Sequence, residues 1–228
     1  MIDPARLSKV ALLHEDDDLA VVIKPPGLAV HGGAGETKKT LLDVLADASG
    51  HRGWSLVHRL DKATSGIMVV AKRADIASQL GAEWDSTEKN YVALAFGAVR
   101  ARTMTTPIAD KHGAKQSAVT ILEPRASLET TTLVDVMIPT GRKHQIRRHL
   151  SEAGHPVVLD DKYGDFAANK RFVKAVRARG APRPKELFLY ASRLVLPDGR
   201  AFAAALPSWW RAALEADGAA VDELDFLS

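Results

Sequence analysis

V-H-R-L-D-K-A-T-S-G, residues 57–66, follows a short apolar segment and carries more polar groups than a plain turn needs. The next run, residues 67–71, reads I-M-V-V-A and predicts a buried strand. Polar groups held on a loop between rigid strands are a common way to build a functional site. Asp61 is the only carboxylate of the stretch, and we interpret it as a catalytic nucleophile or base that its cationic neighbours keep charged. The alternative is a loop aspartate that caps its own turn.

The composition of the 228 residues limits the classes of chemistry and location. There is no cysteine, which excludes disulfides, cysteine-based metal sites and thiol nucleophiles. The sequence has no apolar N-terminal segment of the secretory type and no apolar run approaching ~18 residues. We therefore expect a cytoplasmic protein that does not cross a membrane.

The charge is distributed unevenly along the chain. The whole sequence holds 31 basic and 28 acidic residues, but residues 211–228 hold five acids against Arg211 alone, which leaves 30 basic and 23 acidic residues in residues 1–210. A basic body suits a polyanionic partner such as nucleic acid. The alternative is an alkaline protein with a solvated surface.

The pattern of apolar residues predicts many strands joined by short turns, with helices interspersed irregularly, which indicates an α+β fold. Strands are expected at residues 10–13, 19–23, 54–56, 67–71, 89–96, 103–109, 117–122, 133–138, 187–196 and 201–205. Helices are expected at residues 41–48 behind a Thr40 cap, and at 74–84, 143–152, 169–179 and 207–215. Residues 34–39 are expected to form a mobile loop. We assign residues 1–210 to one catalytic domain and residues 211–228 to an acidic, partly disordered tail.

A second cluster, T-G-R-K-H-Q-I-R-R-H at residues 140–149, holds four cations and two histidines. On the expected helix His144, Arg147 and Arg148 would share one face, since they lie at i, i+3 and i+4. We interpret the cluster as a phosphate-binding segment, with Arg142, Lys143 and His144 as contacts. It also supplies one inward arginine, whose planar fork suits a carboxylate. The alternative is a solvated helix face.

Two further segments are candidates for contacts with RNA. Tyr91 lies in an aliphatic strand, where it is either a core tyrosine or a ring that stacks on an unpaired base. Residues 169–185 contain seven cations, among them Lys170, Arg171 and Lys174. We interpret this segment as a basic arm that contacts phosphates, with a surface insertion as the alternative.

Six segments, in order, resemble those of RluA-type pseudouridine synthases. H-R-L-D-K-A-T-S-G at residues 58–66 is similar to the family signature H-R-L-D-x-x-T-S-G. The others are K-P-P-G at 24–27, K-N-Y-V-A at 89–93, T-G-R-K-H-Q-I-R at 140–147, Y-G at 163–164 and L-Y-A-S-R-L at 189–194. Together they cover roughly residues 20–207.

The resemblance implies a mixed, largely antiparallel central sheet with a catalytic cleft and flanking helices. It also implies an enzyme that isomerises uridine in rRNA or tRNA to pseudouridine, without a metal, a nucleotide or a redox cofactor. Asp61 takes the position of the catalytic aspartate, Tyr91 that of the tyrosine that stacks on the target base, and Arg147 that of the arginine paired with the aspartate. Arg59 takes the position of a residue that fills the gap left by the flipped nucleotide, and we place His58 with it among the RNA contacts. RNA is the expected partner, and we expect a monomer without an obligate protein partner.

This assignment agrees with the physical demands of the reaction. A uridine inside stacked RNA must be extruded before a side chain can reach C1′. An arginine plane can occupy the vacated stack. The detached uracil must be shielded from water by an apolar pocket, for which Ile67, Val69, Tyr91 and Ile146 are candidates.

Two features depart from the family pattern. The family motif G-D-x-x-Y-G is matched imperfectly, and we place the departure at Asp160, which puts the expected local backbone in question. Many relatives also carry an N-terminal S4 domain, for which the roughly 20 residues before the first match are too few. The resemblance therefore implies a member without an S4 domain, whose grip on RNA comes from the catalytic domain.

Two alternative functions compete with an isomerase. The first is an RNA-binding protein without catalysis, which would have no need for Asp61, Tyr91 and Arg147 together. The second is a hydrolase that releases the base, but most glycosidases use two carboxylates and the opening stretch offers one.

Overall fold

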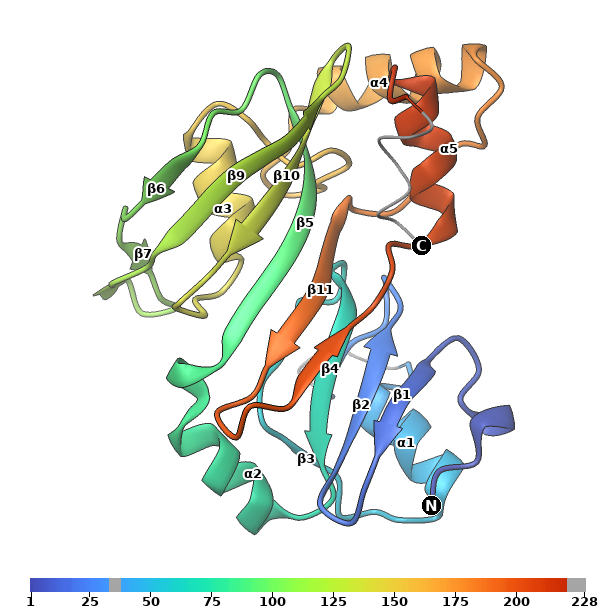
Figure 1. The fold of residues 1–228 in the computed structure, drawn as a ribbon, viewed down its shortest axis with the longest axis vertical. Coiled ribbons are helices and arrows are strands. Elements are labelled where there is room, and N and C mark those ends of the chain that lie inside the picture. The colour runs from blue at the N-terminus through green and yellow to red at the C-terminus, as the bar shows by residue number, and fades with distance from the viewer. Residues whose placement is uncertain (33–37, 221–228) are drawn as a thin grey trace. The chain divides into compact units, whose positions relative to one another are not determined.

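The computed structural model describes residues 1–32 and 38–220, so part of the loop expected at 34–39 and the end of the acidic tail lie outside the described residues. The chain forms two compact units (Figure 1). Unit 1 contains Met1–Glu88 and Arg193–Ala204, and unit 2 contains Lys89–Ser192 and Ala205–Ser228. Helices and antiparallel strand pairs occur in both units, which confirms the predicted α+β class with largely antiparallel pairing. The catalytic cleft implied by the resemblance stays a prediction.

Unit 1 is built on antiparallel strands that pair in the order β1-β2-β4. The predicted N-terminal hairpin is confirmed, with Ala11 opposite Ile23. A short strand pairs with β4, and a second hairpin joins the end of β11 to β12. The elements are η1 (Pro4–Arg6), β1 (Ala11–Glu15), β2 (Leu19–Lys24), α1 (Leu41–Ser49), β3 (Ser55–Leu56), β4 (Ser65–Ala71), α2 (Ala74–Ala82), η2 (Trp84–Ser86), β12 (Ala201–Ala203) and the end, from Arg193, of β11 (Leu189–Val195).

The core of unit 1 lies around β2 and β4. All seven residues of β4 are buried, which confirms the strand predicted at residues 67–71. Alternate residues of facing strands share a side, so Val21 lies opposite Val69 and both pack in one cluster. Each fully buried aliphatic side chain of this kind contributes roughly 1.5–3 kcal/mol. The rest of the cluster comes from Leu19, Ile67, Leu194 and Leu196.

Lys24, the last residue of β2, is a charged side chain with no exposed surface. Its ammonium donates hydrogen bonds to the carbonyl oxygens of Pro25 (3.0 Å), Leu28 (2.9 Å) and Lys62 (3.1 Å). Burial lowers the pKa of Lys24 to about 7, against the opposing effect of the negative charge of Asp61. The buried ammonium therefore ties the end of β2 to the loop at residues 57–66.

The strands of unit 2 pair in the order β11-β5-β10-β9-β6, and only the part of β11 up to Ser192 belongs to this unit. The pairs β5–β10, β10–β9 and β9–β6 are antiparallel. A separate hairpin pairs β7 with β8 around a turn in which Asp110 accepts hydrogen bonds from the N–H groups of His112 and Ala114. The strands are β5 (Glu88–Phe96), β6 (Arg102–Met104), β7 (Ile108–Ala109), β8 (Lys115–Gln116), β9 (Thr120–Ser127) and β10 (Thr131–Met137).

Two strand predictions in this unit were wrong in extent. The strand expected at residues 103–109 is interrupted before Ile108, where Pro107 has no N–H to donate to a neighbouring strand. The strand expected at 117–122 begins at Thr120 and continues to Ser127, through charged residues that hid its period. Arg125 on this strand pairs with Asp135 of β10, with 2.8 Å between Nε and Oδ2, so the charges belong to the sheet.

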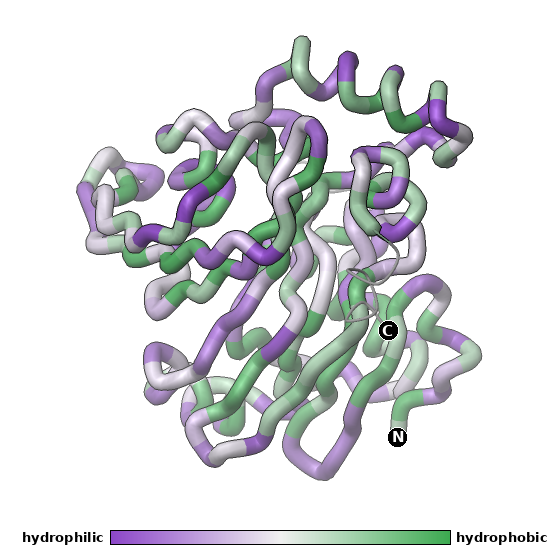
Figure 2. Tube along the Cα trace, turned by 45° about the horizontal axis from the view of Figure 1, so that its top comes forward, coloured by the Kyte–Doolittle hydropathy of each residue, from purple (hydrophilic) through white to green (hydrophobic). Residues whose placement is uncertain are grey.

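The described residues of unit 2 form three helices, α3 (Gln145–Glu152), α4 (Phe166–Ala178) and α5 (Ser208–Ala216). Helix α4 begins three residues earlier than expected, because Oδ1 of Asp165 accepts the N–H of Ala168 (2.9 Å) and caps it. Hydrophilic and hydrophobic residues alternate along α4 (Figure 2). Phe172 and Val176 are buried on its inner side, which leaves a basic outer side.

Helix α5 runs through the boundary expected between residues 210 and 211. Trp210, Leu214 and Asp217 are buried, so the first residues of the expected tail pack within unit 2. The carboxylate of Asp217 accepts hydrogen bonds from the hydroxyls of Thr130 (2.8 Å) and Thr131 (2.6 Å). The division into domains stays a prediction, and the disorder expected of the tail falls largely on residues 221–228, which are outside the described part.

Within residues 1–32 and 38–220, no helix combines the length and the apolar character that crossing a bilayer requires.

Replacing Lys24 by Met is expected to flatten the pH dependence of the free energy of unfolding between about pH 7 and pH 10. The folded pKa of Lys24 is about 7 and its ordinary value is 10.5, so in this window the unfolded chain binds the additional proton. The contribution of Lys24 to stability therefore rises with pH, by at most about 1.4 kcal/mol per pH unit. Denaturant unfolding of both proteins at about pH 7 and pH 9 measures it. Parallel pH profiles for the two proteins would contradict the burial of a titrating ammonium.

Replacing Asp217 by Ala is expected to lower the free energy of unfolding by about 2–3 kcal/mol, because hydrogen bonds to a charged group are lost and a buried hydroxyl is left without an acceptor. Glu215→Ala is the matched control, since that side chain is 40% exposed and lies 4.0 Å from Arg211. Its effect should stay within about 0.5 kcal/mol. Equal losses in the two variants, measured by denaturant unfolding, would show that Asp217 does not anchor α5.

Candidate active site

The loop at residues 57–66 is held in unit 1 by the segment K-P-P-G at 24–27. The carbonyl oxygen of Lys62 accepts hydrogen bonds from the Lys24 ammonium (3.1 Å) and from the N–H of Gly27 (2.8 Å). Gly27 has φ +79°, a left-handed conformation that favours glycine. Two of the six segments that resemble the family are thus in direct contact, one residue away from Asp61.

Asp61 is half-buried, and its carbonyl oxygen accepts the N–H of Thr64 (3.1 Å), which closes a turn. Its carboxylate interacts electrostatically with the charge of Lys24. The cationic neighbours expected to keep Asp61 charged were those of the stretch at residues 57–66, and Lys24 was not expected among them. The available signal was a lysine that ends a continuous apolar strand directly before Pro-Pro-Gly.

His58 is fixed by two contacts within unit 1. Its Nε2 accepts the backbone N–H of Val69 (3.0 Å), so the ring proton belongs on Nδ1. The ring stacks on Trp84, with centroids 4.3 Å apart and an angle of 21° between the planes. These contacts anchor the loop to β4, while Arg59 beside it is exposed. A contact of either residue with RNA stays a prediction.

Arg147 in α3 is the inward arginine of unit 2, with 4% exposure of its side chain. It holds Asp160 through two parallel hydrogen bonds, Nε to Oδ2 (2.7 Å) and Nη2 to Oδ1 (2.6 Å), and Nη2 also contacts Asp161 (2.8 Å). This confirms the prediction of one inward arginine paired with a carboxylate. The ion pair of Arg147 with Asp61 that the resemblance implies stays a prediction, since the two residues belong to different units.

Asp160 has no exposed surface, and its carboxylate is completely enclosed by donors. Burial would raise the pKa of Asp160, but hydrogen bonds from Arg147 and from the N–H groups of Tyr163 and Lys162 hold it below its usual value. Gly164 approaches this turn so closely that a Cβ atom there would lie 2.2 Å from the carbonyl oxygen of Asp160. The turn therefore requires the glycine of the Tyr-Gly segment.

The departure from G-D-x-x-Y-G lies at Leu159, one residue before the expected position at Asp160. Counted back from Tyr163, the aspartate of the motif is Asp160 itself, and the glycine position is Leu159. Leu159 has φ +60°, a left-handed conformation in which glycine is the usual residue. The motif's backbone is thus retained, although the side chain at its first position differs.

Tyr163 is a site residue that the sequence analysis mentioned only as part of a motif. Its hydroxyl lies 2.9 Å from Nδ1 of His144, and the guanidinium carbon of Arg147 lies 5.5 Å from the centre of its ring. His144 does not share the helix face predicted for it, because α3 begins at Gln145 and His144 precedes it with φ +55°. The left-handed backbone turns the His144 ring towards Tyr163.

The remaining cations of residues 140–149 have different environments. Nε of Arg142 donates to the carbonyl oxygen of Ser117 (2.9 Å), and Nη1 of Arg148 donates to that of Ala109 (3.1 Å). Lys143 is exposed. The cluster is therefore partly structural, and the phosphate contacts predicted for Arg142, Lys143 and His144 stay predictions.

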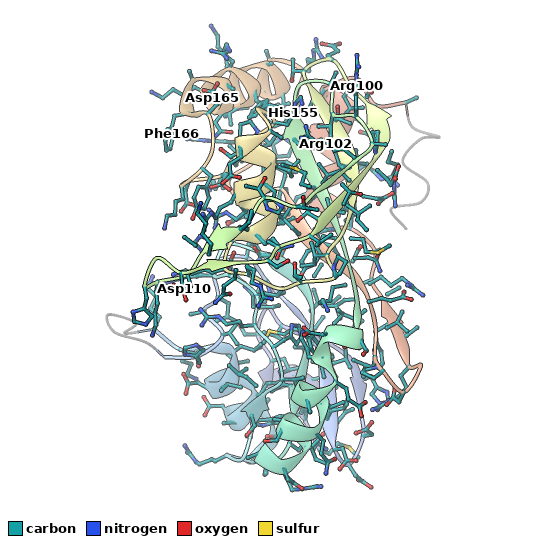
Figure 3. All side chains as sticks on the ribbon, turned by 90° about the vertical axis from the view of Figure 1, so that its left-hand side faces the viewer. Arg100, Arg102, Asp110, His155, Asp165 and Phe166 are labelled. Atoms are coloured by element: carbon teal, nitrogen blue, oxygen red, sulfur yellow. The ribbon has the colours of Figure 1, made fainter. Side chains whose placement is uncertain are left out.

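Tyr91 lies in β5 opposite Val136 of β10 and is 9% exposed. Among the residues expected to contact RNA on the basic arm, Lys170 and Lys174 line one groove on α4, whereas Arg171 lines another together with His155 and Asp165 (Figure 3). The three cations thus do not form one surface. No group of three or more histidine, aspartate or glutamate side chains within the described ranges is arranged to hold a metal ion.

Known proteins resemble this chain over most of its length. Residues 18–152 match the family model described as RNA pseudouridylate synthase. The ribosomal large subunit pseudouridine synthase C of Haemophilus influenzae is 37% identical over 205 residues, covering 81% of this chain and 62% of that protein. The protein of the same name from Escherichia coli K12 is 35% identical over 208 residues, covering 82% of this chain and 64% of that protein. The chain thus spans less than two thirds of the length of these relatives.

Solved structures show the same relationship. The human RNA pseudouridylate synthase domain containing 4 matches with a TM-score of 0.77 and 28% identity, covering 93% of this chain and 94% of that chain. The human RNA pseudouridylate synthase domain containing 1 matches with a TM-score of 0.69 at 23% identity, covering 91% and 86%, and shares the fold. Because the family model covers more than half of the chain and includes Asp61, Tyr91 and Arg147, the chain belongs to the RNA pseudouridylate synthase family.

Proposed function

We propose that this protein isomerises uridine to pseudouridine within RNA. The observation that carries the proposal is the family match over residues 18–152, which contains every residue to which we assign a catalytic role. The reaction breaks the N1–C1′ bond and forms a C5–C1′ bond, while a proton leaves C5 and N1 is protonated. It is an isomerisation, so atoms and electrons balance without an added reagent.

The substrate we propose is ribosomal RNA of the large subunit. The relatives from Haemophilus influenzae and Escherichia coli are named for that substrate, and they match over more than four fifths of this chain. A basic body, with 30 cations against 23 acids in residues 1–210, favours a polyanionic substrate. Transfer RNA is the alternative substrate that the same assay tests.

Asp61 is the residue we propose as the nucleophile or base at the glycosidic bond. Its loop is held by Lys24 and Gly27, so the carboxylate is presented from a fixed backbone, as a catalytic group requires. Lys24 contacts the loop at Lys62 and is therefore a positioning residue.

Two residues of unit 2 complete the proposed machinery. We assign Tyr91 to stacking on the target base and to proton removal from C5, and Arg147 to the family's arginine position. Two parallel hydrogen bonds to Asp160 hold the guanidinium of Arg147 in one orientation, so the position of its charge is fixed. Arg59, exposed on the loop at residues 57–66, is the residue we propose for the stack vacated by base flipping.

We expect the purified protein to convert uridine to pseudouridine in large-subunit ribosomal RNA. RNA carrying labelled uridine is incubated with the protein, digested with nuclease and separated by chromatography. Release of free uracil would indicate a hydrolase and contradict the proposal. Binding without any product on ribosomal or transfer RNA would favour a non-catalytic RNA-binding protein. Conversion of transfer RNA alone would contradict the proposed substrate and support the proposed reaction.

Asp61→Asn is expected to abolish pseudouridine formation, because the amide is neither a nucleophile nor a base, while RNA affinity stays within a few fold. Asp85→Asn is the matched control, since Asp85 is exposed in the same unit and the substitution is chemically identical. The control should retain full activity in the same chromatographic assay. Product formation by Asp61→Asn at the wild-type rate would remove Asp61 from the mechanism.

A further inference from the structure

A groove of about 490 Å³ lies along the outer side of α4 in unit 2. Phe166, Lys170, Val173, Lys174 and Arg177 line it from the helix, at i, i+4, i+7, i+8 and i+11, the spacing of one helix face. Its size falls within the roughly 300–1,000 Å³ of sites that bind small ligands or single groups. Most of the groove lining therefore comes from one helix, and Leu159 and Arg183 complete it from outside the helix.

All charged side chains that line the groove are positively charged. Lys170, Lys174, Arg177 and Arg183 contribute four cations, and no carboxylate is among the lining residues. All four cations are exposed, and in the described part of the chain none of them forms an ion pair with a carboxylate. Arg179, the residue that follows the last residue of α4, is instead paired with Glu129 (2.7 Å). The groove cations are thus available to an external anion.

Phe166 gives the groove a second, aromatic component. It is 62% exposed, more than any other large hydrophobic residue within residues 1–32 and 38–220 except Met1, and it lies at the start of α4 beside the capping Asp165 (Figure 3). Leu159 and Val173 add apolar surface next to the ring. A flat ring beside several cations is the combination that single-stranded nucleic acids recognise, since bases stack on the ring while phosphates contact the cations. An acidic peptide would use the charges without needing the ring.

The groove is also linked to the candidate site within the same unit. Asn169, another lining residue, accepts the N–H of Leu159 on its Oδ1 (2.8 Å) and donates from Nδ2 to the carbonyl oxygen of Asp160 (3.5 Å). Asp160 in turn holds Arg147. A strand of RNA in the groove would therefore contact Asn169, which is connected through Asp160 to Arg147, a proposed catalytic residue.

We propose that the α4 groove binds a single-stranded segment of the substrate RNA that flanks the target uridine, with a base stacked on Phe166 and phosphates on Lys170, Lys174 and Arg177. The inference rests on the proposed function for the identity of the substrate. It assigns a second contact region for the RNA, separate from the loop at residues 57–66. Arg171, which lines the other groove, is left out of it.

Direct binding tests the groove. The probe is a fluorescein-labelled single-stranded RNA of mixed sequence, about 12 nucleotides long, within the range of single-strand binding sites. Phe166→Leu keeps an apolar side chain and removes the ring, and it should weaken binding by about tenfold. Phe166→Tyr keeps a ring and should bind within about twofold of wild type. The double variant Lys170→Ala/Lys174→Ala should reduce the slope of log affinity against log salt by about 1.4, since each phosphate contact on a single strand contributes about 0.7.

The control for charge is the double variant Arg100→Ala/Arg102→Ala, which removes two exposed cations of the same unit that do not line the groove (Figure 3). It should change the salt slope much less than the lysine pair. Equal changes in the two double variants, or unchanged binding by Phe166→Leu, would overturn the inference. Vesicles with phosphatidylserine and a polyglutamate peptide are the competing probes. If either binds tightly in a Phe166-independent manner while RNA does not bind, the groove serves another partner and the inference is wrong.

Cross-linking locates the strand independently. The same RNA with 4-thiouridine is irradiated on the protein, and the cross-linked peptides are identified by mass spectrometry. A peptide containing Phe166 supports the inference, and cross-links confined to other segments contradict it. These measurements require no turnover, so the two proposals fail separately. Phe166-dependent binding without pseudouridine formation would refute the proposed function alone, and pseudouridine formation with unaltered binding by the groove variants would refute the groove alone.

Discussion

The ammonium of Lys24 is the contact on which the architecture around Asp61 depends. Taking a lysine out of water is costly unless its protons find acceptors. Three carbonyl oxygens supply them here, and one belongs to Lys62, the neighbour of Asp61. One buried charge thus fixes the end of a core strand, the Pro-Pro-Gly turn and the loop that bears the proposed catalytic carboxylate. The depressed pKa of Lys24, about 7, reflects the incomplete compensation of that burial.

In unit 2 a buried charge also orients a proposed catalytic residue, but the buried group is an anion and not a cation. There the fully buried group is a carboxylate, Asp160, and the surrounding donors come from Arg147 and two backbone N–H groups. The planar guanidinium and the carboxylate match in geometry, which fixes the direction in which Arg147 points. A lysine in place of Arg147 would keep the positive charge, but it would lack the planar pair of donors that fixes the orientation of the side chain. Each unit therefore orients one proposed catalytic residue through a buried, hydrogen-bonded charge, and not through apolar packing alone.

The sequence allowed the prediction of elements whose period is strong and local. The buried strand at residues 67–71, the Thr40 cap and the N-terminal hairpin follow from apolar runs and turn residues, and the structure confirms them. The contact between Lys24 and Lys62 could not be predicted from spacing, because it joins residues 38 positions apart through a backbone carbonyl. His144 was misplaced for a different reason. Its left-handed backbone delays the start of the helix to Gln145, and nothing in a run of charged residues marks which of them will adopt that conformation. The charge run predicted one inward arginine, but its pattern alone did not indicate which cation is buried, since Arg147, which is buried, and Lys143, which is exposed, fit one helix pattern.

The left-handed backbone of Leu159 has a consequence for how the chain tolerates change. A non-glycine residue in this conformation costs roughly 1–2 kcal/mol, and glycine would remove that cost. The Leu159 side chain, however, forms part of the apolar wall of the α4 groove, and its N–H is held by Asn169. Selection for thermal stability alone would favour glycine at this position, and the groove would then lose the apolar side chain of Leu159. Thermal stability thus favours glycine at this position and the groove lining favours leucine, so a stabilised variant of this protein should leave Leu159 unchanged.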